Sequence, residues 1–319
     1  MRLLARTLLV LLIVAAALVG YSVHVSRPAV DVAWNAGRSH IIADPESALT
    51  FARTYSHLIR VTRHTGYAVK GIDISAGLGE EGDLIEAYGR LGYEGLATAP
   101  GTAVTVPVSD LTMPVEFHYP HVAAGTNYSE HAEEVYLDDP PFLFPKLAQA
   151  SAWNAPVMFH PRLDFEAELA MVPLDDIDSP DDRVDYGLVL ANDFTDRWTL
   201  VRQLDLGAPM GTTGFAASKG RASFLPTGYL FVIPRSATFY ENISVELAVN
   251  GEARQRFSAD EMILEINDIV RQAFDQSERT FYDGDRPVRL LPQGSIPRGT
   301  LILTGTAAGV LFKPVNVWN

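Results

Sequence analysis

The chain has 319 residues, with 25 lysines and arginines against 39 aspartates and glutamates, and it contains no cysteine. The formal net charge of −14 argues against a nucleic-acid partner, because phosphate contacts require clustered lysine and arginine side chains. The lack of cysteine excludes disulfides, thiolate nucleophiles and cysteine-ligated metals, so a bound metal would have oxygen or imidazole ligands. The length allows one large or two medium-sized domains.

The N-terminus carries an uncharged, strongly apolar segment. Arg2 and Arg6 precede a run without charge at residues 7–23, which would be about 25 Å long as a helix, close to the short limit for crossing a bilayer. A signal peptide cleaved near Ala17 and an uncleaved anchor both fit, and the apolar residues that continue beyond Ala17 favour the anchor. A buried helix fits less well, because the run has no polar stripe. We therefore expect residues 1–30 to be a membrane anchor or signal segment, with the rest of the chain outside the cytoplasm.

Residues 31–115 are predicted to form a small helical subdomain. Asp44 is a helix-capping residue followed by proline at the first helical position, and the pattern continues as a helix to about His64. The buried face of this helix would consist of apolar residues three and four positions apart, namely Ala48, Phe51, Ala52, Tyr55 and Ile59. A second, short helix is predicted over residues 83–91.

From about residue 120 the pattern becomes mostly strands. Apolar, β-prone stretches occur at residues 163–172, 185–193, 229–233 and 244–249. The last stretch leads into Asn250-Gly251, a strong signal for a tight hairpin. Ser258 and Glu261 form a capping-box pattern, which predicts a helix over residues 259–274.

Three acidic residues on predicted strands suggest a divalent metal ion. Glu166 and Glu168 are two positions apart, so both carboxylates leave the same face of a strand. Two like charges at this spacing repel unless a cation lies between them, and Asp193 supplies a third carboxylate at the end of another strand. Oxygen ligands of this kind suit Mg²⁺, Mn²⁺ or Ca²⁺ rather than zinc. The alternative from spacing alone is a solvated sheet face, where most such glutamate pairs lie.

A histidine and a glutamate form a second feature with chemical meaning. His131 and Glu134 are three positions apart in a polar segment, and on one helical turn they would face each other. A histidine oriented by a carboxylate can act as a general base that deprotonates water. Taken alone, such a pair is usually only a surface contact.

Seven short motifs follow one another between residues 125 and 314. In chain order they are Asn127-Tyr128 with His131 and Glu134, Phe144-Pro145-Lys146, residues 164–170 with Glu166 and Glu168, Asn192-Asp193 with Arg197, Lys219 with Phe224, Pro226 and Gly228, Asn250-Gly251-Glu252 with Arg254-Gln255, and Thr304-Gly305-Thr306 with Gly309-Val310. Each motif is weak alone. Together and in this order, they make the chain resemble the fumarylacetoacetate hydrolase family.

The resemblance implies a fold and a metal. The fold would be an α+β fold of mixed β-roll or β-sandwich type with flanking helices, forming a catalytic domain at residues 116–319 that is usually dimeric. One Mg²⁺ or similar ion (Mn²⁺ or Ca²⁺) would be held by Glu166, Glu168 and Asp193.

The resemblance also implies roles for other side chains. His131 with Glu134 would activate water, and Lys219 would stabilise negative charge near the metal. The substrate would be contacted by Tyr128, Arg197 and Thr306.

The substrate-contacting region departs from the family pattern. Trp198 and Leu200 follow Arg197, so an apolar group replaces one polar contact to the substrate. Thr300 and Ala307 also differ from the residues common in relatives. Because the metal and base positions are intact, these departures affect the identity of the substrate more than the chemistry.

We therefore expect a metal-dependent hydrolase that cleaves a carbon–carbon bond of a 2,4-dioxo acid of the acylpyruvate or fumarylacetoacetate type. The first alternative is an isomerase, hydratase or decarboxylase of 2-oxo acids at the same metal site. The second is a non-catalytic, membrane-tethered binding protein on this fold. The His131–Glu134 pair favours hydrolysis, since tautomerisation could proceed without an activated water.

Overall fold

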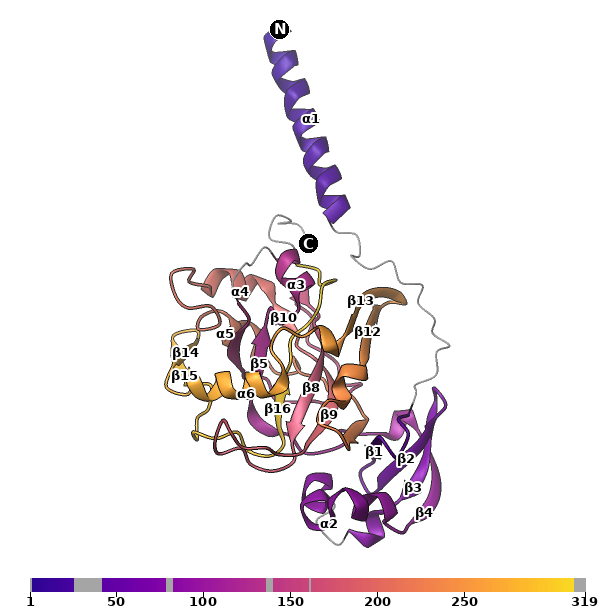
Figure 1. Cartoon of the computed structure of the whole chain (residues 1–319). Helices are drawn as coiled ribbons and strands as arrows, with labels where there is room; N and C mark the ends of the chain where they lie inside the picture. The colour runs from indigo at the N-terminus through magenta and orange to yellow at the C-terminus, as the bar shows by residue number, and fades with distance from the viewer. Residues whose placement is uncertain (1, 26–41, 79–82, 136–139, 161, 313–319) are drawn as a thin grey trace.

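The structure is a computed structural model that describes residues 2–25, 42–78, 83–135, 140–160 and 162–312 (Figure 1). The start of the predicted N-terminal subdomain, residues 31–41, therefore lies outside the described residues. The first element is the helix α1, Arg2–Val25, which stands clear of the other elements in Figure 1.

One large mixed sheet forms the body of the protein. Its strands are β1 Ala48–Arg53, β2 Leu58–His64, β3 Ala68–Asp73, β4 Thr102–Pro107, β5 His118–Gly125, β6 Phe142–Lys146, β8 Ala167–Pro173, β9 Tyr186–Asn192, β11 Phe231–Pro234 and β16 Thr300–Leu303. They lie in the order β4-β3-β2-β1-β11-β9-β8-β16-β5-β6. Neighbours pair antiparallel except β16 and β5, which are parallel.

The remaining elements are short. Three two-stranded sheets pair β7 Leu163–Asp164 with β10 Thr195–Asp196, β12 Ser244–Val249 with β13 Glu252–Ser258, and β14 Thr280–Asp283 with β15 Arg286–Arg289. The other α-helices are α2 Leu84–Thr98, α3 Ser129–Glu134, α4 Arg197–Gln203, α5 Phe215–Lys219 and α6 Ile266–Asp275. Single 3₁₀ turns are η1 Ser75–Gly77, η2 Val108–Asp110, η3 Phe239–Asn242 and η4 Ala259–Glu261.

The large sheet is buried on both faces around β8. Ala170 and Val172 pack into one apolar cluster, whereas Leu169 and Met171 pack into the other. A strand buried on both faces is apolar throughout instead of alternating with polar residues. The acidic pair at the start of β8 is therefore an exception within an apolar strand, and it lies on the Ala170 side because side chains alternate.

Most of the predicted strands are confirmed. The stretch at 163–172 contains β7 and β8, the stretch at 185–193 contains β9, and β12 ends in the predicted hairpin. Asn250 and Gly251 have φ values of 55° and 83°, the left-handed conformation that a tight hairpin turn requires. The fold class is therefore the predicted one, a mixed α+β fold with a large sheet and few helices.

The helix predicted over residues 44–64 is wrong, because that segment forms the β1–β2 hairpin. Asp44 accepts the Glu46 N–H at 3.0 Å, so the capping residue closes a turn and not a helix. Tyr55, predicted to be buried, is 96% exposed. Residues 42–115 contain four strands and, where they are described, a single α-helix, so the helical character of the predicted subdomain is not confirmed.

Two helix predictions are right in part. A helix does begin beside Asp83, whose side chain accepts the N–H groups of Ile85 and Glu86, but this helix, α2, continues to Thr98 instead of ending near residue 91. The capping box of Ser258 and Glu261 is present, but it caps the short turn η4, and α6 begins only at residue 266.

The prediction of a membrane-spanning N-terminal segment is contradicted. Among the described residues, no helix combines the length and the hydropathy that a bilayer crossing requires. The uncharged run at 7–23 would be about 25 Å long, whereas the hydrocarbon core is about 30 Å thick. The predicted membrane attachment, and with it the predicted location outside the cytoplasm, loses its basis.

Candidate metal centre and active site

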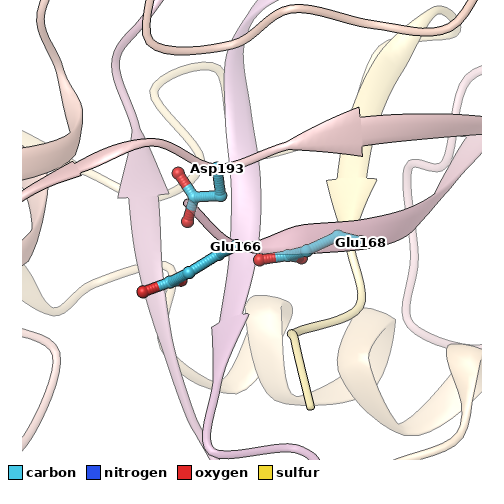
Figure 2. Close-up of side chains that lie close together, drawn as sticks. All are labelled: Glu166, Glu168 and Asp193. Carbon is cyan, nitrogen blue, oxygen red and sulfur yellow. The ribbon is translucent and has the colours of Figure 1, made fainter. Parts of the chain in front are cut away.

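Three buried carboxylates converge where β8 and β9 meet. Glu166 and Glu168 flank Ala167, which pairs with Asn192, and Asp193 follows Asn192 directly. One oxygen from each of Glu166, Glu168 and Asp193 can be chosen so that all three lie within 4.8 Å of one another. Figure 2 shows the side chains of Glu166 and Glu168 extending in the same direction, with Asp193 above Glu166 on the neighbouring segment. These three residues could hold a divalent metal ion.

The backbone around the carboxylates is fixed by hydrogen bonds between the two strand ends. The Asp193 N–H donates to the Glu166 carbonyl at 2.8 Å, and the Glu166 N–H donates to Asn192 Oδ1 at 3.0 Å. The carboxylates therefore start from a rigid frame, which a metal site needs because its ligands must keep their spacing.

Three buried cations neutralise two of the carboxylates. Lys219 Nζ donates to Glu166 Oε2 at 2.6 Å and to Asp193 Oδ2 at 2.7 Å. Arg197 donates to Glu166 Oε1 at 2.6 Å. Lys146 Nζ lies 2.5 Å from Asp193 Oδ1 and donates to two backbone carbonyls, those of Lys219 and Phe224.

These contacts determine how the acidic groups ionise. Burial alone would raise the pKa of Glu166, but the positive charges of Lys219 and Arg197, with a further contribution from the nearby His131 imidazole, outweigh it and lower that pKa to about 2. Burial lowers the pKa of the Lys219 ammonium, but the charges of Asp193 and Glu166 more than reverse this and raise it. Lys219 and Glu166 are therefore both charged inside the protein.

Glu168 differs from its two neighbours. Burial raises the pKa of Glu168 well above its usual value, and the nearby charges of Asp193 and Glu166 raise it further. Within the described residues its hydrogen bond comes from the Gly305 N–H, at 2.8 Å, and no lysine or arginine is paired with it. A buried carboxylate beside two others, without a cation of its own, fits a site whose missing positive charge is a metal ion.

The predicted histidine–glutamate pair is present on α3. His131 is 6% exposed, and its Nδ1 lies 3.4 Å from Glu134 Oε2. Both carboxylate oxygens of Glu134 accept the Gly309 N–H at 3.1 Å, which fixes the carboxylate. Because the His131 imidazole contributes to the lowered pKa of Glu166, it lies within electrostatic reach of that carboxylate.

The residues predicted to contact the substrate are all buried here, but in different roles. Arg197 is held by Asp164 through Nε at 2.8 Å as well as by Glu166. Tyr128 is 2% exposed and packs edge-on against Phe257, with 4.8 Å between the ring centres. Thr306 Oγ1 donates to the Ala167 carbonyl and accepts from Gln255, both at 2.8 Å. Their contacts with a substrate stay predictions.

Sequence reasoning assigned no role to Asp164, which is central to the site. Its carboxylate accepts the Arg197 Nε–H and the backbone N–H groups of Phe165, Leu311 and Phe312, at distances of 2.8–3.0 Å. The only signal in the sequence was that Asp164 continues the period-two spacing of Glu166 and Glu168. Its partners at 311 and 312 are about 150 residues away, so no local pattern could indicate them.

The C-terminal segment 305–312 closes over these acidic groups. Its backbone N–H groups donate to Glu168 from Gly305, to Glu134 from Gly309, and to Asp164 from Leu311 and Phe312. Gly309 has a φ of 111°, and a Cβ there would lie 1.9 Å from the Arg254 carbonyl oxygen, so only glycine fits.

A family model and curated relatives match this chain. The family model described as "Fumarylacetoacetate (FAA) hydrolase C-terminal" matches residues 120–318. A 2,4-didehydro-3-deoxy-L-rhamnonate hydrolase of Sphingomonas sp. (strain SKA58) is 28% identical over 227 residues, which are 66% of this chain and 76% of the relative. An oxaloacetate tautomerase of Bacillus subtilis (strain 168) is 27% identical over 205 residues, which are 59% and 58% of the two chains.

Solved structures share the fold. The fumarylacetoacetate hydrolase of the psychrophile Exiguobacterium antarcticum has a TM-score of 0.55 to this chain at 22% identity, covering 83% of this chain and 88% of the other. At this identity the likeness concerns the fold alone.

Proposed function

The chain belongs to the fumarylacetoacetate hydrolase family, and from this premise we propose that it is a metal-dependent hydrolase that cleaves a carbon–carbon bond of a 2,4-dioxo acid. The observation that carries the proposal is the buried group of Glu166, Glu168 and Asp193, with the His131–Glu134 pair within electrostatic reach of Glu166. The hydrolase among the relatives supports the reaction class. A homodimer, the assembly implied by the family resemblance, is part of the proposal.

Glu166, Glu168 and Asp193 would hold the metal, which we propose to be Mg²⁺, Mn²⁺ or Ca²⁺ because all three ligands are hard oxygens. A bound ion of this kind would supply Lewis-acid polarisation of the substrate's oxygen atoms. Arg197 and Thr306 would contact the substrate's carboxylate end beside the metal ligands, and Tyr128 would be a further substrate contact.

The protein's own groups account for the proton transfers. His131, oriented by Glu134, takes a proton from water, and the water oxygen bonds to the carbon of the distal carbonyl. The bond between that carbon and the adjacent CH₂ group then breaks, and its electron pair moves to the CH₂ carbon as an enolate. The Lys219 ammonium stabilises this negative charge, and His131 returns the proton to the carbon. The products are a carboxylic acid and a 2-oxo acid.

A tautomerase acting on 2-oxo acids is the second candidate. One relative is an oxaloacetate tautomerase, and moving a proton between carbon and oxygen needs a base but no attacking water. The same His131 could serve in either reaction, so the products decide between them.

The test combines product analysis with two variants. Metal-stripped protein is supplied with Mn²⁺ or Mg²⁺ and assayed with acylpyruvates, whose cleavage releases a carboxylic acid, and with oxaloacetate, whose tautomerisation changes its absorbance. We expect Asp193→Ala to lose Mn²⁺ binding, and His131→Ala to keep Mn²⁺ binding while losing turnover. The hydrolase proposal fails if the wild-type protein binds no divalent ion, or if it interconverts tautomers without cleaving any acylpyruvate. Loss of Mn²⁺ binding in both variants would instead show that His131 has been assigned the wrong role.

A further inference from the structure

The backbone of Ala167, between the two glutamates, is held on one edge by two side chains. Its N–H donates to Gln255 Oε1 at 2.9 Å, and its carbonyl accepts from Thr306 Oγ1 at 2.8 Å. Gln255 Nε2 also donates to Thr306 Oγ1, at 2.8 Å. Gln255, Ala167 and Thr306 therefore form a closed ring of hydrogen bonds, and they are only 1%, 6% and 3% exposed.

The ring supplies the backbone of Ala167 with the hydrogen-bond partners that β16 would provide if it continued to this point. The β8–β16 ladder has its last residue pair at Ala170 and Leu303, and beyond it the Thr304 N–H still reaches the Leu169 carbonyl. Ala167 is two residues further along the same edge, past the end of β16. A buried N–H and carbonyl left there without partners would each cost free energy, and the Gln255 side chain from β13 meets this need.

The position of the ring matters because Ala167 connects two proposed metal ligands. The other edge of this segment is fixed to β9, through the pairing of Glu168 with Ala191 and the hydrogen bond from Asp193 to Glu166. Without the ring, the peptide groups on both sides of Ala167 could turn about that edge. The directions of the Glu166 and Glu168 side chains would then change relative to each other.

We propose that Gln255 is a positioning residue that, together with Thr306, fixes the spacing of Glu166 and Glu168 for a divalent metal ion. This inference rests on the proposed metal site. It gives the Thr306 hydroxyl a role toward the metal ligands, separate from the predicted contact with the substrate. It also gives a function to the β12–β13 hairpin, which carries Gln255 to the site.

The test measures Mn²⁺ affinity by calorimetric titration of the metal-stripped full-length chain. Loss of a group that orients metal ligands typically weakens metal binding about 10- to 100-fold, and we expect Gln255→Leu to have this effect. Gln276→Leu is the matched control, because it makes the same replacement at a glutamine that is also buried, at 8% exposure, beyond the end of α6. Both variants can lose thermal stability, but only Gln255→Leu should lose Mn²⁺ affinity.

Two replacements of Thr306 provide an independent measurement and cover the case in which Gln255→Leu does not fold. Thr306→Val keeps the shape of the side chain but can neither donate to Ala167 nor accept from Gln255, so it should weaken Mn²⁺ binding about tenfold or more. Thr306→Ser keeps the hydroxyl and should restore binding to within about threefold of the wild type.

The outcomes separate this inference from the proposed reaction. Wild-type affinity in Gln255→Leu, or equal affinities in the valine and serine variants of Thr306, would overturn the positioning role and leave the hydrolase proposal intact. If Gln255→Leu weakens Mn²⁺ binding but the wild-type protein cleaves no 2,4-dioxo acid, the positioning role is supported and the hydrolase proposal is rejected. A wild-type protein that binds no Mn²⁺ would overturn both.

Discussion

Replacement of Lys219 by methionine tests whether its ammonium is shared by two buried carboxylates. Lys219 is 2% exposed, and its Nζ lies 2.6 Å from Glu166 and 2.7 Å from Asp193. With an effective dielectric constant of about 20, each contact corresponds to an attraction of about 6 kcal/mol before the cost of desolvation. Removing one partner of a buried ion pair usually costs about 3–5 kcal/mol, because the other charge stays buried without compensation.

The expected result for metal-free Lys219→Met is therefore a large fall in thermal stability. For 319 residues, with an unfolding entropy of about 2.1 cal/mol/K per residue, a loss of about 3–5 kcal/mol corresponds to about 4–8 °C in Tm, which differential scanning calorimetry resolves easily. Lys70→Met is the matched control, since Lys70 is exposed on β3, and its Tm should stay within about 1 °C of the wild type.

Mn²⁺ gives a second readout of the same variant. The ammonium of Lys219 would repel a cation bound to the same carboxylates, so Lys219→Met should bind Mn²⁺ about tenfold more tightly than the wild type and regain most of its lost Tm. Its turnover should stay low, because the enolate loses its positive partner. A metal-free variant as stable as the wild type, or one that Mn²⁺ does not stabilise, would refute the shared ion pair.

Two further variants test the groups that orient the base and the arginine. Glu134→Gln removes the negative charge beside His131 Nδ1, so kcat should fall about 100-fold or more. The Mn²⁺ affinity of this variant, measured by titration, should stay unchanged. A normal kcat would show that the carboxylate does not assist the base. Asp164→Asn places an N–H group or a neutral oxygen against Arg197 Nε, so KM for a carboxylate substrate should rise at least tenfold, with a smaller change in kcat. An effect on kcat alone would show that Arg197 does not bind the substrate.

The part of the site that the sequence could predict depends on local spacing. Glu166 and Glu168 share a face because side chains alternate along a strand, and His131 meets Glu134 because residues three apart meet on a helical turn. Asp193 was identifiable because it ends an apolar strand. These relations involve at most a few residues along the chain, so composition and periodicity were enough to suggest them.

The partners that hold these groups in place could not be predicted in the same way. Gln255 meets Ala167 across 88 residues, and Phe312 meets Asp164 across 148. Contacts of this kind follow from the order of strands in the sheet, which has no signature in any short window of sequence. The misread β1–β2 hairpin has a related cause. Because five of the six residues of β1 are buried, its apolar residues show no alternation, and their spacing imitated a helix.

The balance of charge at the centre explains how an acidic protein could bind an anionic substrate. Four carboxylates face three cations there, namely Glu166, Glu168, Asp193 and Asp164 against Lys146, Lys219 and Arg197. With every group ionised these side chains carry one excess negative charge, and the raised pKa of Glu168 reflects how unfavourable that excess is without a further cation. A divalent ion reverses the sign to one excess positive charge. Charges more than about 8 Å away are largely screened at physiological ionic strength, so the chain's total of −14 matters less to the substrate than this local sum. The metal would then be needed for the substrate to bind as well as for it to react.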